Sequence, residues 1–357
     1  MKKGYLVLEN GEVFEGVLPY DTEATGEVVF NTSMTGYQEI ISDPSYAGQI
    51  IVFCYPQIGN YGLNDLDSES EHLHLHGVVT GEQCDTPSHY LSKHSFASEL
   101  SQKKVPSLTG VDTRALVKML RNHGTMKGKI MSEIPAGKIN WNEGKSYVPT
   151  VSVQESISYP NEGSHIVLID YGYKKSILTS LQSLGCAVTV VPYHTTFDQI
   201  VNLNPDGVVL SNGPGDPEAL SDYYDTIRII SETYPVFGIC LGHQLLALAH
   251  GASTRKLIFG HRGSNHPVKH VETSKVYITS QNHGYEVVQE SLPGTGFVTT
   301  FINLNDGTVE GLMHKKYNIQ SVQFHPEAHA GPSDTAYLFD AFIQQITRTG
   351  DQHYAFT

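Results

Sequence analysis

The seven residues Gly-Ile-Cys-Leu-Gly-His-Gln at 238–244 decide the fold predicted for the second half of the chain. Apolar runs at 235–237 and 245–249 flank them, which predicts a short buried strand, a tight turn and an apolar helix. Both glycines allow the strained backbone and close approach of neighbouring segments that a Gly-x-Cys-x-Gly turn needs. At the start of a helix, amide N–H groups and the helix dipole favour a thiolate and can receive an oxyanion. Cys240 is therefore the candidate nucleophile; the alternative is a buried structural cysteine.

Composition limits the class of protein. A chain of 357 residues with 39% hydrophobic content predicts two domains, each with its own core. The formal net charge of -14 argues against a general affinity for nucleic acid or for an anionic membrane. The four cysteines are widely spaced, which indicates neither a disulfide framework nor a zinc ribbon. With no signal core and no apolar run of about 18 residues, we expect a soluble cytoplasmic protein that is not exported.

The first half is rich in strand patterns. Residues 5–8 and 13–17 predict a hairpin that turns at Asn10-Gly11, and further strand patterns fall at 28–30, 50–53 and 78–79. The polar segment 31–39 reads as a loop, and helices are predicted at 88–102 and after Asp112, which can cap a helix that ends at Gly124. Strands precede helices without βαβ alternation, so we expect a separate α+β domain at 1–132.

The second half is predicted to be an α/β domain at 164–350, after a proline-punctuated linker at 133–163. Its predicted strands are 166–169, 188–191, 207–210 and 235–239, and its predicted helices are 174–184 and 218–233. This alternation indicates a mostly parallel sheet, in which ligands bind beyond the carboxyl ends of the strands. Cys240 lies at such an end.

A base and its orienting carboxylate are predicted near the C-terminus. The strand pattern at 318–324 runs into His-Pro-Glu at 325–327, and residues i and i+2 of an extended chain point to the same side. His325 and Glu327 therefore complete the order nucleophile, base and orienter, which is a triad by role. His283 and His243 are rival bases, although His243 lies on the helix of Cys240, where packing is the more common role.

Two polar segments are candidates for substrate contacts. Ser-Asn-Gly-Pro-Gly-Asp-Pro at 211–217 follows a strand, and its glycines could bring backbone N–H groups close to a substrate; the alternative is an ordinary turn. Gln-Asn-His-Gly-Tyr at 281–285 could bind a zwitterionic amino acid. Neither loop has the P-loop pattern, and we recognise no nucleotide site of that kind in the sequence.

The segment His-Leu-His-Leu-His at 72–76 could place three imidazoles on one face of a strand. Adjacent positions on one face make a poor zinc cage without further ligands, so we expect a solvated face and no metal.

Together these motifs resemble a known family. The motifs at 238–244, 212–217 and 324–327 are similar, in this order and spacing, to the class I (triad) glutamine amidotransferase domain. The segments at 27–39, 110–116, 123–128 and 260–267 are similar to the small, glutamine-hydrolysing subunit of carbamoyl-phosphate synthetases. The resemblance covers essentially the whole chain, although residues 72–108 carry little of it.

The resemblance implies a role for each matching residue. Cys240 would be the nucleophile, His325 the base and Glu327 its partner, and the backbone amides of Gly213 and Leu241 would receive the oxyanion. The implied glutamine contacts are Ser45, Gly213, Gly215, Leu241, Gln244, Asn282, Gly284 and Tyr285. Because Ser45 comes from the first domain, the resemblance implies a site near the domain interface. Tyr285 stands where the family commonly has Phe, and 329–330 is His-Ala instead of the more usual Ser-Pro.

The resemblance also implies an activity and a partner. Such a subunit hydrolyses L-glutamine through a γ-glutamyl thioester and passes ammonia to a large synthetase subunit, in a heterodimer or a tetramer of heterodimers. The large subunit would use bicarbonate, ATP and Mg²⁺ or Mn²⁺ to make carbamoyl phosphate for pyrimidine or arginine biosynthesis, and this chain would hold no cofactor. The alternatives are another class I amidotransferase, which would lack the first 130 residues, and a non-catalytic scaffold, which would lack a triad member.

Overall fold

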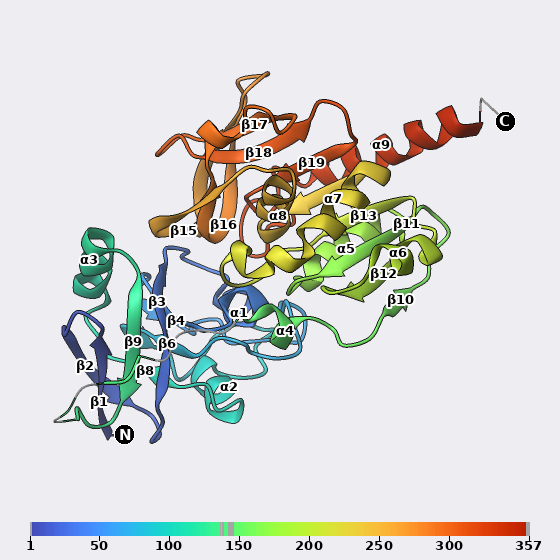
Figure 1. Cartoon of the computed structure of the whole chain (residues 1–357). Coiled ribbons are helices and arrows are strands. Elements are labelled where there is room, and N and C mark those ends of the chain that lie inside the picture. Colours follow the sequence, from blue (N-terminus) through green and yellow to red (C-terminus); the bar gives the residue numbers. More distant parts are fainter. Residues whose placement is uncertain (1, 136, 138, 142–145, 355–357) are drawn as a thin grey trace. The chain divides into compact units, whose positions relative to one another are not determined.

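The computed structural model describes residues 2–135, 137, 139–141 and 146–354, in two compact units (Figure 1). Unit 1 consists of Met1–Tyr147 and Leu257–Gly263, and unit 2 of Val148–Lys256 and Ser264–Thr357. Within the described residues, no helix is both long and apolar enough to cross a membrane.

The predicted linker at 133–163 differs from the structure in its second half. Helix α4 (Val148–Val151) and strand β10 (Ile157–Tyr159) lie in unit 2, and β10 pairs antiparallel with β12 (Ala187–Pro192). Residues 136, 138 and 142–145 of the predicted linker lie outside the described residues. The fading apolar periodicity therefore marked an edge strand and a short helix as well as a connection.

Unit 1 contains a seven-stranded sheet with the order β2-β1-β9-β3-β4-β6-β8. Its strands are β1 (Lys2–Leu8), β2 (Val13–Leu18), β3 (Ala24–Asn31), β4 (Gln49–Phe53), β6 (Gly77–Val79), β8 (Ser107–Leu108) and β9 (Met126–Met131). The predicted hairpin is present: β1 and β2 pair antiparallel, and Gly11 at the turn has φ 92°. A separate two-stranded sheet pairs β5 (Gln57–Ile58) with β7 (Glu82–Gln83).

The prediction that the first domain lacks βαβ alternation is wrong. Strands β3, β4, β6 and β8 run parallel, with α1 (Tyr37–Ser42) between β3 and β4 and α2 (Phe96–Gln102) between β6 and β8. Both helices are short: α1 begins inside the polar segment 31–39, and the helix predicted at 88–102 starts only at Phe96, after the Ser95 cap. A 3-10 helix, η1 (Pro44–Tyr46), follows α1. Helices of six or seven residues are too short for a clear apolar period.

Helix α3 (Thr113–His123) matches its prediction. The Asp112 carboxylate accepts a hydrogen bond from the Ala115 N–H at 2.9 Å, and Gly124 ends the helix. Leu116 and Leu120 are fully buried, so one face of α3 belongs to the core of unit 1.

The histidine segment 72–76 is not a strand. Leu75 makes one isolated bridge to Ala47, the His76 Nδ1 atom lies 2.8 Å from the Thr25 carbonyl oxygen, and the rings of His72 and His74 meet edge to face. The three imidazoles therefore have different surroundings and do not form one face.

Unit 2 contains a ten-stranded sheet with the order β10-β12-β11-β13-β14-β19-β18-β17-β15-β16. The remaining strands are β11 (His165–Asp170), β13 (Gly207–Leu210), β14 (Val236–Ile239), β15 (Thr254–His270), β16 (Val276–Val287), β17 (Phe297–Asn303), β18 (Val309–His314) and β19 (Ile319–Val322). The five strands from β12 to β19 in this order are parallel, as the sequence predicts. β18 pairs antiparallel with β19, and β17 in turn pairs antiparallel with β18.

Helices cover both faces of the parallel core. They are α5 (Lys175–Ser183), α6 (Phe197–Leu203), α7 (Tyr224–Thr233), α8 (Leu241–Ala249) and α9 (Tyr337–Tyr354), with 3-10 helices η2 (Pro217–Tyr223) and η3 (Gln289–Ser291). Alternate residues of β11 pack in two hydrophobic clusters: Val167 with α6, α7 and α8, and Ile166 with α5 and α9. The sheet is thus buried on both sides, as parallel sheets require. Helix α6 was not predicted.

We predict that Phe342→Ala in α9 lowers the free energy of unfolding by about 3–5 kcal/mol, because Phe342 is fully buried against Phe237 and truncation leaves a cavity. Urea denaturation followed by circular dichroism measures the change. Phe342→Leu keeps most of the apolar volume and should cost less than half as much. An unchanged unfolding curve for Phe342→Ala would show that α9 does not pack on the sheet in solution.

Candidate active site

The backbone at Cys240 is strained. β14 ends at Ile239, and α8 begins at Leu241, so Cys240 alone makes the turn, with φ 53° and ψ -101°. A positive φ is unfavourable for a residue with a β-carbon. Hydrogen bonds hold it in place: the Cys240 N–H donates to the Val322 carbonyl oxygen at 2.9 Å, and the Gln244 N–H donates to the Cys240 carbonyl oxygen at 3.2 Å.

Both glycines of this turn are required by close backbone contacts. A β-carbon on Gly242 would lie 2.3 Å from the Leu210 carbonyl oxygen. One on Gly238 would lie 2.8 Å from the Gly242 carbonyl oxygen. The two glycines therefore allow α8 to start directly against the ends of β13 and β14, which explains the Gly-x-Cys-x-Gly spacing.

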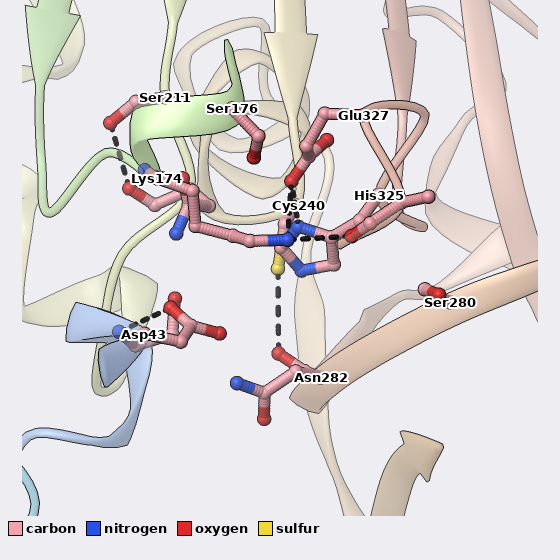
Figure 2. Close-up of polar contacts among 12 residues, drawn as sticks. Asp43, Lys174, Ser176, Ser211, Cys240, Ser280, Asn282, His325 and Glu327 are labelled. Atoms are coloured by element: carbon pink, nitrogen blue, oxygen red, sulfur yellow. Dashed lines mark hydrogen bonds and ion pairs between the residues drawn. The ribbon is translucent and has the colours of Figure 1, made fainter. Parts of the chain in front are cut away.

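His325 and Glu327 meet at the end of the neighbouring strand, as the i, i+2 spacing predicts. The Nδ1 atom of His325 lies 2.6 Å from Oε1 of Glu327, and both side chains are buried (Figure 2). The His325 N–H donates to the Ser280 carbonyl oxygen at 2.9 Å, which anchors the backbone. The other ring nitrogen, Nε2, has no partner of good hydrogen-bond geometry among the described residues and faces Cys240 (Figure 2). The His325 imidazole therefore lies between the Cys240 sulfur and the Glu327 carboxylate.

Lys174 extends this line and was not found by sequence reasoning. Its Nζ atom lies 3.1 Å from Oε1 of Glu327 and donates to the Ala328 carbonyl oxygen at 2.7 Å, and its side chain is only 3% exposed (Figure 2). It precedes α5 at the carboxyl end of β11, where the sequence indicated only a helix start. Its position beyond a parallel strand is the one signal that could have found it.

The buried charges control the ionisation of the site. Burial by itself would lower the pKa of His325, but the Glu327 carboxylate and hydrogen bonding to Cys240 raise this pKa well above its ordinary value. Burial would likewise raise the pKa of Glu327, but the charges of Lys174 and His325 hold it well below its ordinary value. The directions of these two pKa shifts favour a carboxylate at Glu327 and an imidazolium at His325.

Polar side chains connect Cys240 to residues 281–285, which lie within strand β16. The Cys240 Sγ atom lies 3.6 Å from the Asn282 carbonyl oxygen, and Gln323 Nε2 donates to the sulfur at 3.7 Å. Gln244 Nε2 donates to Gln323 Oε1 at 3.0 Å and to the Tyr285 carbonyl oxygen at 2.9 Å. The structure therefore brings together the predicted residues Gln244, Asn282 and Tyr285, and adds Gln323, which was read only as part of a strand.

The predicted oxyanion donors also lie together. A β-carbon on Gly213 would lie 2.9 Å from the Leu241 side chain, so the 211–217 loop contacts the start of α8. In the described part of the chain, neither the Gly213 N–H nor the Leu241 N–H donates a hydrogen bond to another residue. Two such N–H groups beside a nucleophile can receive a negative oxygen.

The other predicted contacts lie in three places. Gly215 has φ +93° in the same loop, and its neighbour Asp216 accepts a hydrogen bond from the Tyr285 hydroxyl at 3.1 Å. Gly284 lies in strand β16, as do Asn282 and Tyr285. Ser45 lies in unit 1, in η1, where its N–H donates to the Asp43 carboxylate at 2.9 Å. A role for Ser45 in the site stays a prediction.

The two rival histidines are engaged elsewhere. His243 is fully buried, its Nδ1 atom lies 2.9 Å from the Ser321 hydroxyl, and burial lowers its pKa to about 3. His283 uses Nδ1 toward the Tyr285 carbonyl oxygen at 2.7 Å and Nε2 toward Gln281 at 2.9 Å. His325 is therefore the histidine placed to act on Cys240.

Both halves of the chain match known protein families. Residues 167–345 match the family described as "Glutamine amidotransferase class-I", so most of unit 2 is a domain of that class. Residues 6–130 match "Carbamoyl-phosphate synthase small chain, CPSase domain".

Similar curated proteins cover nearly the whole chain. The "Carbamoyl phosphate synthase arginine-specific small chain" of Halalkalibacterium halodurans is 49% identical, over 98% of each chain. The pyrimidine-specific small chain of the same organism is 48% identical over 99% of each chain. The "Carbamoyl phosphate synthase small chain" of Listeria innocua is 49% identical over 99% of this chain and 100% of its own. The chain belongs to the carbamoyl-phosphate synthase small-chain family.

We predict that Gly242→Ala disrupts the turn at Cys240, because the added methyl group would overlap the backbone of Leu210. The unfolding midpoint and the rate of Cys240 alkylation by iodoacetamide, followed by mass spectrometry, should both fall. Gly251→Ala is the control: Gly251 has φ +91° but nothing within 4 Å, so it should cost only about 1–2 kcal/mol and leave the alkylation rate unchanged. Equal effects of the two variants would contradict the proposed contact.

We predict that Glu327→Gln lowers the pKa of His325 from its raised value toward that of an ordinary histidine, because the neighbouring negative charge is lost. The imidazole resonances of labelled histidine, followed by NMR between pH 6 and 11, measure the pKa, and the spectrum of His325→Asn assigns the signal. Glu290→Gln removes an exposed carboxylate and should change nothing. A His325 titration that is the same in Glu327→Gln and wild type would exclude Glu327 as the source of the shift.

Proposed function

We propose that this chain hydrolyses the side-chain amide of L-glutamine at Cys240 and delivers the ammonia to a large synthetase chain. Membership of the small-chain family makes the chain the glutamine-hydrolysing part of a carbamoyl-phosphate synthase. The observation that carries the residue assignment is the buried line of Lys174, Glu327 and His325 that ends at the Cys240 sulfur.

The first half of the reaction forms a thioester. The Cys240 thiolate attacks the amide carbon of glutamine, and the Gly213 and Leu241 N–H groups receive the negative oxygen that results. When the intermediate collapses, the C–N bond breaks and the leaving nitrogen takes the proton of the His325 imidazolium. Ammonia and a γ-glutamyl thioester are formed, and His325 is left neutral.

The second half restores the site. Neutral His325 takes a proton from water through Nε2, and the oxygen of that water attacks the thioester carbon. The C–S bond breaks, glutamate leaves, and Cys240 is again a thiolate beside an imidazolium. Glu327 keeps its negative charge throughout, because Lys174 and His325 hold its pKa low. It orients the ring and stabilises the imidazolium.

Substrate recognition is assigned to the polar groups around Cys240. The α-amino group of glutamine needs hydrogen-bond acceptors, and its α-carboxylate group needs donors. We assign these roles to Gln244, Asn282 and Tyr285, together with the backbone of Gly215 and Gly284. We include Ser45 of unit 1 as a further contact. Asp216 accepts a hydrogen bond from the Tyr285 hydroxyl, which joins the 211–217 loop to β16.

The ammonia requires a partner. Ammonia released into water is protonated and loses its nucleophilicity, and this sequence contains no P-loop motif to supply ATP chemistry. We therefore assign ATP, bicarbonate and Mg²⁺ or Mn²⁺ to the large chain, reached by an enclosed path, in a heterodimer or a tetramer of heterodimers. The product, carbamoyl phosphate, would serve pyrimidine or arginine biosynthesis; similar curated proteins are named for both.

We predict that Cys240→Ser abolishes glutamine-dependent carbamoyl phosphate synthesis by the complex, with a loss of at least about 100-fold, because a serine hydroxyl is not ionised at neutral pH. Synthesis from added ammonium should persist. Cys186→Ser is the control, since Cys186 packs in the core of unit 2 with Ile166 and Leu181 and has no part in the site. Glutamine use that survives in Cys240→Ser would rule out this nucleophile.

A further inference from the structure

One stretch of this acidic chain is basic. Residues 113–132 contain Arg114, Lys118, Arg121, Lys127 and Lys129 and no Asp or Glu, although the formal net charge of the chain is -14. The first three belong to α3, at positions i, i+4 and i+7. That spacing places them on one face of the helix. The opposite face, with Leu116 and Leu120, is buried, so the basic face is held outward.

This basic face lines a groove in unit 1. Arg114, Lys118 and Arg121 surround a volume of about 660 Å³ together with Val117, Cys54 and Phe259. The Arg121 guanidinium lies over the Phe259 ring, 5.8 Å from its centre. The groove therefore combines three positive charges with an apolar wall.

None of the three cations has an acidic partner among the described residues. Across the part of the chain that the structure describes, no carboxylate lies within 4 Å of Arg114, Lys118 or Arg121. Four other cations in the described part of unit 1 are paired with carboxylates: Lys2, Lys3, Lys93 and Lys129. The protein has 37 acidic residues, so a row of cations without acidic partners creates a local positive potential. Such a potential attracts an external anion.

We propose that this basic groove of α3 is a docking surface for an acidic segment of the large synthetase chain. The proposal rests on the partnership assigned under the proposed function. From Arg114 to Arg121 the helix rises by about 10.5 Å, so one phosphate-sized anion cannot reach all three cations. An extended segment with several carboxylates can, and an apolar side chain between them fits against Val117 and Phe259. Nucleic acid is the less favourable occupant because the net charge of -14 repels its phosphates.

The test reverses the three charges. Arg114→Glu, Lys118→Glu and Arg121→Glu are combined in the full chain, and its affinity for the large chain of the same organism is measured by isothermal titration at 50 and 300 mM salt. Steering by complementary charge is strongest at low salt. We expect the triple variant to bind at least about tenfold more weakly than wild type at 50 mM salt and to lose the salt dependence. Its glutaminase activity without the large chain should be unchanged, since no α3 residue lies in the active site.

A control variant distinguishes the effect of the α3 surface on binding from the effect of net charge. Lys103→Glu, Lys275→Glu and Lys315→Glu change the net charge equally at three exposed positions outside α3 and should bind like wild type. Binding of the triple α3 variant that equals this control overturns the docking surface. The proposal is also overturned if the wild-type chain binds a DNA duplex through α3 while the α3 variant and the control variant bind the large chain equally. If the wild-type chain itself does not bind the large chain, the partnership assigned under the proposed function is wrong. The comparison between the α3 variant and the control variant tests only the role of α3.

Discussion

The active site depends on a row of buried charges, Lys174, Glu327 and His325. Removing a single charge from water costs several kcal/mol, and this cost is offset only when the charge has close partners of opposite sign. Glu327 has two such partners, at 3.1 and 2.6 Å, and Lys174 also donates to the Ala328 carbonyl oxygen. Loss of either outer member would leave a carboxylate with one partner in a dry interior. The row therefore fixes the positions of the three side chains, even though its net contribution to the free energy of folding is small.

The row is held in position by backbone contacts. Asp170, at the end of β11, accepts hydrogen bonds from the N–H groups of Val153, Gly172 and Tyr173 at 2.7 to 2.8 Å. These bonds shape the short loop that leads to Lys174. Burial raises the pKa of Asp170, while the three N–H groups act in the opposite direction. A carboxyl group in the core of unit 2 thus supports the loop from which the buried lysine reaches Glu327.

The strain at Cys240 and the charges beside it have a common origin in the parallel sheet. β14 lies between β13 and β19, so the turn after β14 and the His-Pro-Glu segment after β19 emerge at the same edge. The positive φ of Cys240 costs about 1–3 kcal/mol, which the flanking strand and helix overcome. The result is a sulfur at a helix start, facing an imidazole on the next strand.

Much of this could be predicted from sequence because it depends on local rules. The hairpin at Asn10-Gly11, the Asp112 cap, the parallel core of unit 2 and the i, i+2 placement of His325 and Glu327 all follow from spacing within a few residues. The βαβ units of unit 1 were missed because α1 and α2 are too short to show a period.

Sequence by itself determined which residues are the candidates for the chemistry, because a strained turn that needs two glycines and a histidine two residues before a carboxylate are properties of short segments. Tertiary structure alone decided how they are charged. Lys174 lies 153 residues from Glu327 in the chain and reaches the site from the end of β11, whereas His325 and Glu327 follow β19. The ionisation of Glu327 and His325 depends on such contacts and on burial, and the strength of both is set by distances in space that no local pattern contains.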